Sequence, residues 1–76
     1  MEVTLEAKFD IGDEVFFRSH GEIACGTVTH LQAIYVKSEN GSIYLGATYR
    51  LKDSRGEMYR EDFWEKRLHS TREELE

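Results

Sequence analysis

Apolar and polar residues alternate along much of this chain, which is the pattern of β-strands rather than of helices. Near the N-terminus every odd position is apolar: Val3, Leu5, Ala7, Phe9 and Ile11. Because successive side chains of a strand point to opposite faces, this alternation places one set in a core and the other in water. The pattern predicts an N-terminal strand over residues 1–10.

Four further strands are predicted at residues 14–18, 23–31, 33–37 and 43–51, and residues that favour turns separate the first from the second and the third from the fourth. Gly21 accepts positive φ in the first of these turns. Asn40 and Gly41 are typical of a tight hairpin in which both residues take positive φ. Gly26 interrupts its strand and indicates a bulge or a close approach of another backbone.

The same alternation predicts which side chains fill the core. Five apolar residues share one face of the strand at 43–51: Ile43, Leu45, Ala47, Tyr49 and Leu51. Phe9 and Phe17 also fall on inward positions, whereas Phe16 and Tyr44 fall on outward positions. Beyond Gly56 the pattern weakens.

The last twenty residues predict short elements only. Met58 and Tyr59 suggest one more short strand, and Glu61–Phe63 a single helical turn. Ser70, Thr71, Arg72 and Glu73 fit a capping box, in which a hydroxyl accepts a backbone N–H and a glutamate reaches back. This predicts a short helix at residues 70–76.

Five or six short strands within 76 residues favour a curled sheet. A flat sheet of this size would leave one apolar face and two edges uncovered, and curling into a barrel removes both problems. We therefore expect an all-β, single-domain protein over residues 1–76: a small β-barrel of five to six strands with a short C-terminal helix.

The segment Phe9–Phe17, with its Gly12-Asp13 and Val15, followed by Gly26-Thr27-Val28, resembles the opening of SH3-like barrels of the KOW and Tudor type. In these residues Gly12 would let the chain turn, Asp13 would bond backbone N–H groups and Val15 would enter the core. The resemblance implies an SH3-like barrel.

Three later segments, Tyr49–Leu51, Glu61–Phe63 and Ser70–Leu75, resemble small proteins of bacteria and their phages. That similarity implies a phage-type accessory or inhibitor role. The chain lacks the aromatic motifs with which better-known SH3-like branches bind proline-rich peptides.

The net charge of −5 is unevenly distributed. Residues 1–49 carry a net charge of −4, residues 50–72 a net charge of +2, and the last four residues a net charge of −3. Because phosphate contacts need cations, this acidic balance disfavours a general nucleic-acid binder. One cysteine and no long apolar run predict a cytoplasmic protein without a membrane span.

The sequence offers little for catalysis, so we expect no enzyme, cofactor or metal. Cys25 and His30 are five positions apart on one predicted strand and would face opposite sides; Cys25 is better explained as a small core residue. The histidines lack metal-ligand spacing. The carboxylate pairs at 13–14 and 61–62 are adjacent in sequence and do not converge.

Exposed aromatic and basic residues are the better candidates, and they predict a protein-binding surface. The predicted protein-binding residues are Trp64, Arg60, Arg67, Phe16 and Tyr44. Trp, Tyr and Arg dominate interface hot spots. The alternative for Trp64 is that it or Phe63 closes the open end of the barrel.

Three further interpretations stay open from the sequence. The basic region 50–72 with Trp64 could bind nucleic acid. Acidic residues within 1–22 could imitate phosphate charge and inhibit a host protein that binds nucleic acid. The N-terminal strand could pair with a second copy to form a homodimer.

Overall fold

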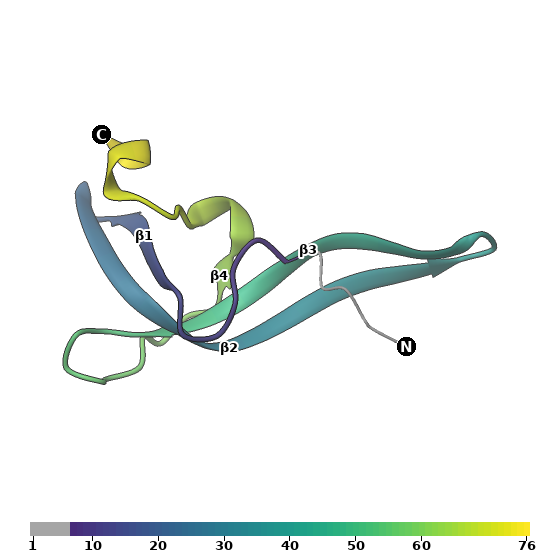
Figure 1. The fold of residues 1–76 in the computed structure, drawn as a ribbon, viewed down its shortest axis with the longest axis horizontal. Helices are drawn as coiled ribbons and strands as arrows, with labels where there is room; N and C mark the ends of the chain where they lie inside the picture. The colour runs from purple at the N-terminus through teal and green to yellow at the C-terminus, as the bar shows by residue number, and fades with distance from the viewer. Residues whose placement is uncertain (1–6) are drawn as a thin grey trace.

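The computed structural model describes residues 7–76 as one antiparallel sheet in the order β1-β2-β3-β4 (Figure 1). The strands are β1 (Glu14–Ser19), β2 (Glu22–Ser38), β3 (Gly41–Lys52) and β4 (Phe63–Trp64). The sheet curls into a half-barrel. The prediction of a mostly β protein is confirmed, and the finer prediction of a five- to six-stranded barrel is not.

Residues 7–13 form a turn against the sheet and contain no strand. Gly12 has φ of +94°, and its N–H donates to the carbonyl of Val28 at 2.9 Å. The Asp13 carboxylate accepts the N–H of Asp10 at 2.8 Å, as the sequence suggested. Phe9 is buried. The remainder of the predicted N-terminal strand, residues 1–6, lies outside the described residues.

A two-residue turn joins β1 to β2. Ser19 and Glu22 pair across it, and the central residues His20 and Gly21 have φ of 52° and 81°. Positive φ at both positions is what a type I′ turn requires, and its twist matches that of the flanking strands. The predicted turn at Ser19–Glu22 is confirmed.

β2 is a single strand of 17 residues and replaces the two strands predicted at 23–31 and 33–37. It runs antiparallel to β3 as far as the pair Ser38 and Gly41, while β1 pairs with it only up to Thr27. The far half of the hairpin therefore extends away from the rest of the sheet (Figure 1). Of the predicted turn residues, Gly41 has positive φ and Asn40 does not, so the predicted turn type is wrong.

A β-bulge changes the phase of β3. Ile34 pairs with Gly46, but the next residue of β2, Tyr35, pairs with Tyr44, which leaves Leu45 as the extra residue. An extra residue reverses the faces of the positions beyond it. Ile43 and Leu45 are consequently exposed, and the prediction that they share the core face of Tyr49 is wrong.

The core lies inside the half-barrel. Its buried residues are Phe9, Val15, Phe17, Val28, Ala47, Tyr49, Leu51, Phe63 and Leu68. Gly26 lets two strands approach closely, because an added Cβ would lie 3.0 Å from the Cβ of Leu51. The predicted inward positions of Phe9, Phe17 and Tyr49 are confirmed. Tyr44, predicted to face outward, is half-buried and packs against this core.

The chain after β4 connects the two outer strands. A 3₁₀ turn, η1 (Glu65–Arg67), leads to His69, which pairs with Phe16 of β1 through N–H···O bonds of 2.8 and 2.9 Å. The strand predicted at Met58 and Tyr59 is reduced to one bridge between Met58 and Lys52. These single bridges take the place of additional strands.

The C-terminal segment forms one 3₁₀ turn, η2 (Arg72–Leu75), in place of the predicted helix over 70–76. The capping box is absent because Thr71 makes no side-chain cap bond. Instead the Ser70 hydroxyl donates to Glu74 at 3.1 Å, and Arg18 donates to the carbonyl of Leu75. Within residues 7–76 no helix has the length and apolar character to cross a membrane.

Candidate functional site

One face of the extended hairpin carries an exposed row of apolar side chains. Val36 of β2 and Ile43 of β3 face each other as a cross-strand pair. Ile34 and Gln32, two and four residues before Val36 on β2, lie on the same face of the sheet. Thr48 pairs with Gln32 on one side and with Trp64 on the other, which places Trp64 on this face too.

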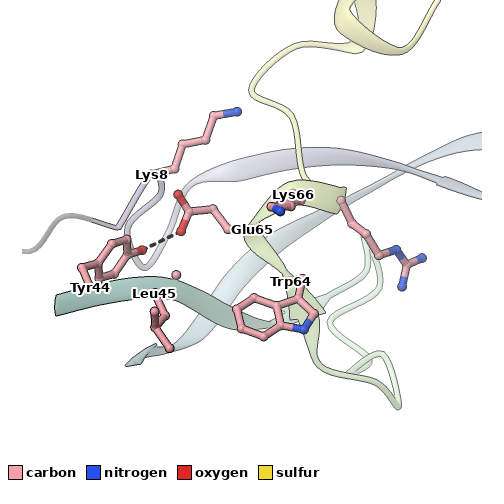
Figure 2. A pocket seen from close by; sticks show the side chains of 8 residues that line it. Lys8, Tyr44, Leu45, Trp64, Glu65 and Lys66 are labelled. Carbon is pink, nitrogen blue, oxygen red and sulfur yellow. Dashed lines mark hydrogen bonds between the residues drawn. The ribbon is translucent and has the colours of Figure 1, made fainter. Parts of the chain in front are cut away.

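Leu45 belongs to the same surface. Figure 2 shows Tyr44 and Leu45 on opposite sides of β3, and Tyr44 points toward Glu65. We define the hairpin patch as Val36, Ile43, Leu45 and Trp64. Ile43, Leu45 and Trp64 are 54%, 58% and 48% exposed. Among the described residues 7–76, none shields this patch fully from solvent.

Trp64 lies against the backbone of β3 at Gly46. A Cβ at Gly46 would lie 3.0 Å from Cζ3 of the indole, and Gly46 has φ of +147°, which side-chain-bearing residues rarely adopt. Both observations favour glycine at this position. The indole therefore packs on the backbone of β3 at the bulge, beside Gly46.

A pocket of about 650 Å³ opens beside Trp64 at the base of the patch (Figure 2). Tyr44, Leu45, Gly46 and Trp64 contribute its apolar lining. The Tyr44 hydroxyl donates to the Glu65 carboxylate at 2.6 Å. Burial and this bond to a carboxylate raise the pKa of Tyr44 far above its ordinary value of 10. The hydroxyl thus stays protonated and holds Glu65 in place.

Cations surround the pocket. Lys8, Lys66 and Arg67 line it, with Glu65 as its acidic residue. The Arg67 guanidinium lies 5.0 Å from the centre of the Phe63 ring and 3.3 Å from the carboxylate of Glu61. Because this ion pair is half-exposed, solvent screens it and it contributes little to stability. Arg67 can therefore exchange Glu61 for another carboxylate.

No family model, curated protein or solved structure matches this chain.

The structure brings together three of the five predicted binding residues. Trp64, Arg67 and Tyr44 line the same pocket. Phe16 is half-buried on β1 opposite His69, and Arg60 is exposed before β4 without lining the pocket. Of the aromatic pair, Phe63 is buried in the core and Trp64 is 48% exposed.

Sequence reasoning missed Ile43, Leu45, Gly46 and Lys8 as parts of this surface. One signal was present: an isolated glycine within a strand pattern indicates a bulge. Applied to Gly46, that rule would have reversed the faces assigned to the residues before it and moved Leu45 and Ile43 out of the predicted core.

The other candidate chemistry is dispersed. Cys25 is exposed on β2, so its prediction as a core residue is wrong. His69 lies 3.1 Å from the Glu74 carboxylate in a contact that anchors the C-terminal turn. In the described part of the chain, no three metal-ligating side chains converge.

Proposed function

We propose that this chain is a non-enzymatic protein-binding module that contacts its partner through the hairpin patch and the adjoining pocket. The observation that carries the proposal is the hairpin patch itself: four large apolar side chains exposed together on one face of an extended ribbon. Contiguous apolar surface of this kind on a small protein is typical of interaction sites.

The hairpin patch is separate from the core that stabilises the fold. The core is filled by residues on the opposite face of β3 and on neighbouring elements, including Tyr49, Leu51 and Phe63. Trp64 follows Phe63 directly but points to the other face. A bulky aromatic residue next to a cationic rim has the composition of an interface hot spot.

Nucleic-acid binding through residues 50–72 is the alternative that the pairing of charges disfavours. Arg50 lies 3.4 Å from the carboxylate of Asp62, and Arg67 is paired with Glu61. These two ion pairs leave fewer unpaired cations along residues 50–72 for the many phosphate contacts that nucleic-acid binding requires. Nucleic-acid binding predicts strong salt dependence and sensitivity to Arg60→Ala and Arg67→Ala, which a mobility-shift assay at low salt measures.

Two narrower ideas remain proposals. An SH3-like barrel is supported by the turn at Gly12 and Asp13 and by the burial of Val15. An inhibitor role, in which acidic residues imitate phosphate, is supported by the exposed carboxylates of Asp10, Asp13 and Glu14. Asp13 also accepts a backbone N–H, so part of this charge has a local structural role.

Affinity purification with matched variants tests the proposed function. Wild-type chain and Ile11→Ser, which removes an apolar side chain that is 62% exposed outside the hairpin, should retain the same partner. Trp64→Ala and Leu45→Ser should lose it while keeping the wild-type circular dichroism spectrum. If Trp64→Ala unfolds the chain, Trp64 belongs to the core and the proposed site is wrong.

A further inference from the structure

We infer that the partner presents a peptide segment that carries both large apolar side chains and carboxylates, and that this segment occupies the pocket beside Trp64. The inference rests on the proposed function and adds the chemistry of the partner. It is drawn from the combination of an apolar floor, a cationic rim and an acidic protein.

The floor of the pocket accepts apolar side chains. Leu45 and Trp64 are exposed at its edge, and Gly46 between them contributes only backbone. The volume of about 650 Å³ lies within the range of pockets that hold compact ligands, about 300–1,000 Å³. Space of this size, open on one side, suits side chains of a bound segment.

The charge at the rim is opposite to the charge of the whole chain. Lys8, Lys66 and Arg67 supply three cations to the lining, while the protein carries −5. The acidic residue of the lining, Glu65, already accepts the Tyr44 hydroxyl. Complementary charge selects partners and speeds their encounter. The ligand best matched to this rim is anionic.

A peptide fits the surface better than a nucleic-acid strand. The apolar residues of the patch beside Trp64 are aliphatic (Val36, Ile43 and Leu45), whereas binding of single strands uses several aromatic rings on which successive bases stack. The six-membered ring of Trp64 already lies against Gly46. Aliphatic side chains are matched by leucine or valine of a partner rather than by bases.

Fluorescence of Trp64, the single tryptophan of the chain, provides the test. The probes are capped eight-residue peptides of alternating glutamate and leucine, lysine and leucine, and glutamate and serine, together with an eight-nucleotide oligothymidylate. We expect the glutamate–leucine peptide alone to change the emission of the full chain in a saturable way. Added salt should weaken this binding.

Variants locate the binding. Lys66→Glu and Leu45→Ser should each raise the dissociation constant of the glutamate–leucine peptide about tenfold. The matched controls are Lys52→Glu and Ile11→Ser, which change an exposed lysine and an exposed apolar residue outside the pocket. They should leave binding unchanged. Circular dichroism confirms that each variant is folded.

Several results would overturn the inference, and they differ from failure of the proposed function. Equal binding of the lysine–leucine peptide would refute the charge requirement, and equal binding of the glutamate–serine peptide would refute the apolar requirement. Absence of saturable binding would refute both requirements. The proposed protein binding would then still be tested separately by the affinity purification. Preferred binding of the oligonucleotide would refute peptide recognition. A dimer in light scattering that Leu45→Ser dissociates would assign the pocket to a second copy.

Discussion

The two ends of the β2–β3 hairpin have the same backbone ladder and similar residue types but opposite exposure. At the base, Tyr49 and Leu51 are fully buried, whereas toward the tip Ile43 and Leu45 are more than half exposed. The base is covered by β1, by β4 and by residues 7–13, and none of the elements described in residues 7–76 covers the tip.

This difference means that apolar residues on one strand can contribute very differently to stability. Those at the base stabilise the fold because their burial removes them from water. Those at the tip are largely exposed and therefore add little to folding; we propose that they contact a partner. The bulge at Leu45 divides the two regions, because it is the point at which the core face and the exposed face of β3 exchange.

The largest expected effect comes from the same substitution made at both ends of β3. Leu51→Ala should lower the free energy of unfolding by about 2–5 kcal/mol, because it removes fully buried methyl groups and leaves a cavity. Leu45→Ala, six residues earlier, should change it by less than about 0.5 kcal/mol. Urea unfolding measures both, and similar values would refute the division between the two ends.

A smaller effect is expected where the two ends meet. Gly46→Ala adds a Cβ 3.0 Å from the indole of Trp64 and strains a backbone with positive φ, which should cost about 1–3 kcal/mol. It should also shift the emission of Trp64. Gly56→Ala is the control, because φ there is +84° and no atom lies within 4 Å. A Gly46→Ala chain with unchanged emission would show that Trp64 does not rest on this glycine.

Tyr44→Phe tests the contact between the core and the pocket. Loss of the hydrogen bond to Glu65 should cost about 1 kcal/mol at neutral pH. Tyr35→Phe serves as control, since Tyr35 packs its ring on Tyr44 at 5.4 Å and is exposed.

The same substitution should alter the stability at high pH. Because the pKa of Tyr44 is higher in the folded chain than its usual 10, the contribution to stability is complete below pH 10 and is lost as the pH rises above it. Between pH 7 and 11 the melting temperature should fall less steeply for Tyr44→Phe than for the wild type. Parallel curves would contradict the assigned contact.

The smallest effect is expected at the C-terminal turn, far from both ends of the hairpin. Burial would raise the pKa of Glu74, but hydrogen bonds from Ser70 and His69 outweigh it and lower that pKa below 4.5. The contribution of Glu74 is therefore present above pH 4.5 and is lost as the pH falls below it. Melting temperatures between pH 7 and 3 should decline slightly less for Glu74→Gln, and an identical decline would show that these bonds do not form.

The base of the hairpin could be predicted from the sequence, and the tip could not. Alternation correctly placed Phe17, Tyr49 and Leu51 because neither β1 nor the base of β3 contains an extra residue. Counting by twos failed beyond Gly46, since one extra residue reverses the faces of Ile43 and Leu45. The predicted break between strands 23–31 and 33–37 is absent because the sequence has no turn residue at position 32, and β2 continues through it.

The candidate site was predicted only in part, because its residues are brought together by tertiary structure. Trp64 and Arg67 are close in sequence and were identified from composition. Lys8 reaches the same pocket from a distant turn, and no local pattern indicates that contact. Cys25 was assigned to the core by residue type, although its position on β2 exposes it.

Residue-resolved amide hydrogen exchange on the monomer tests the central claim most directly. An uncovered two-stranded ribbon is marginally stable and opens locally. The account predicts that amides within residues 34–45 which bond between strands exchange much faster than those of Val28, Tyr49 and Leu51, which require global unfolding. Equal protection at both ends would contradict it, because the tip would then belong to the same cooperative core as the base.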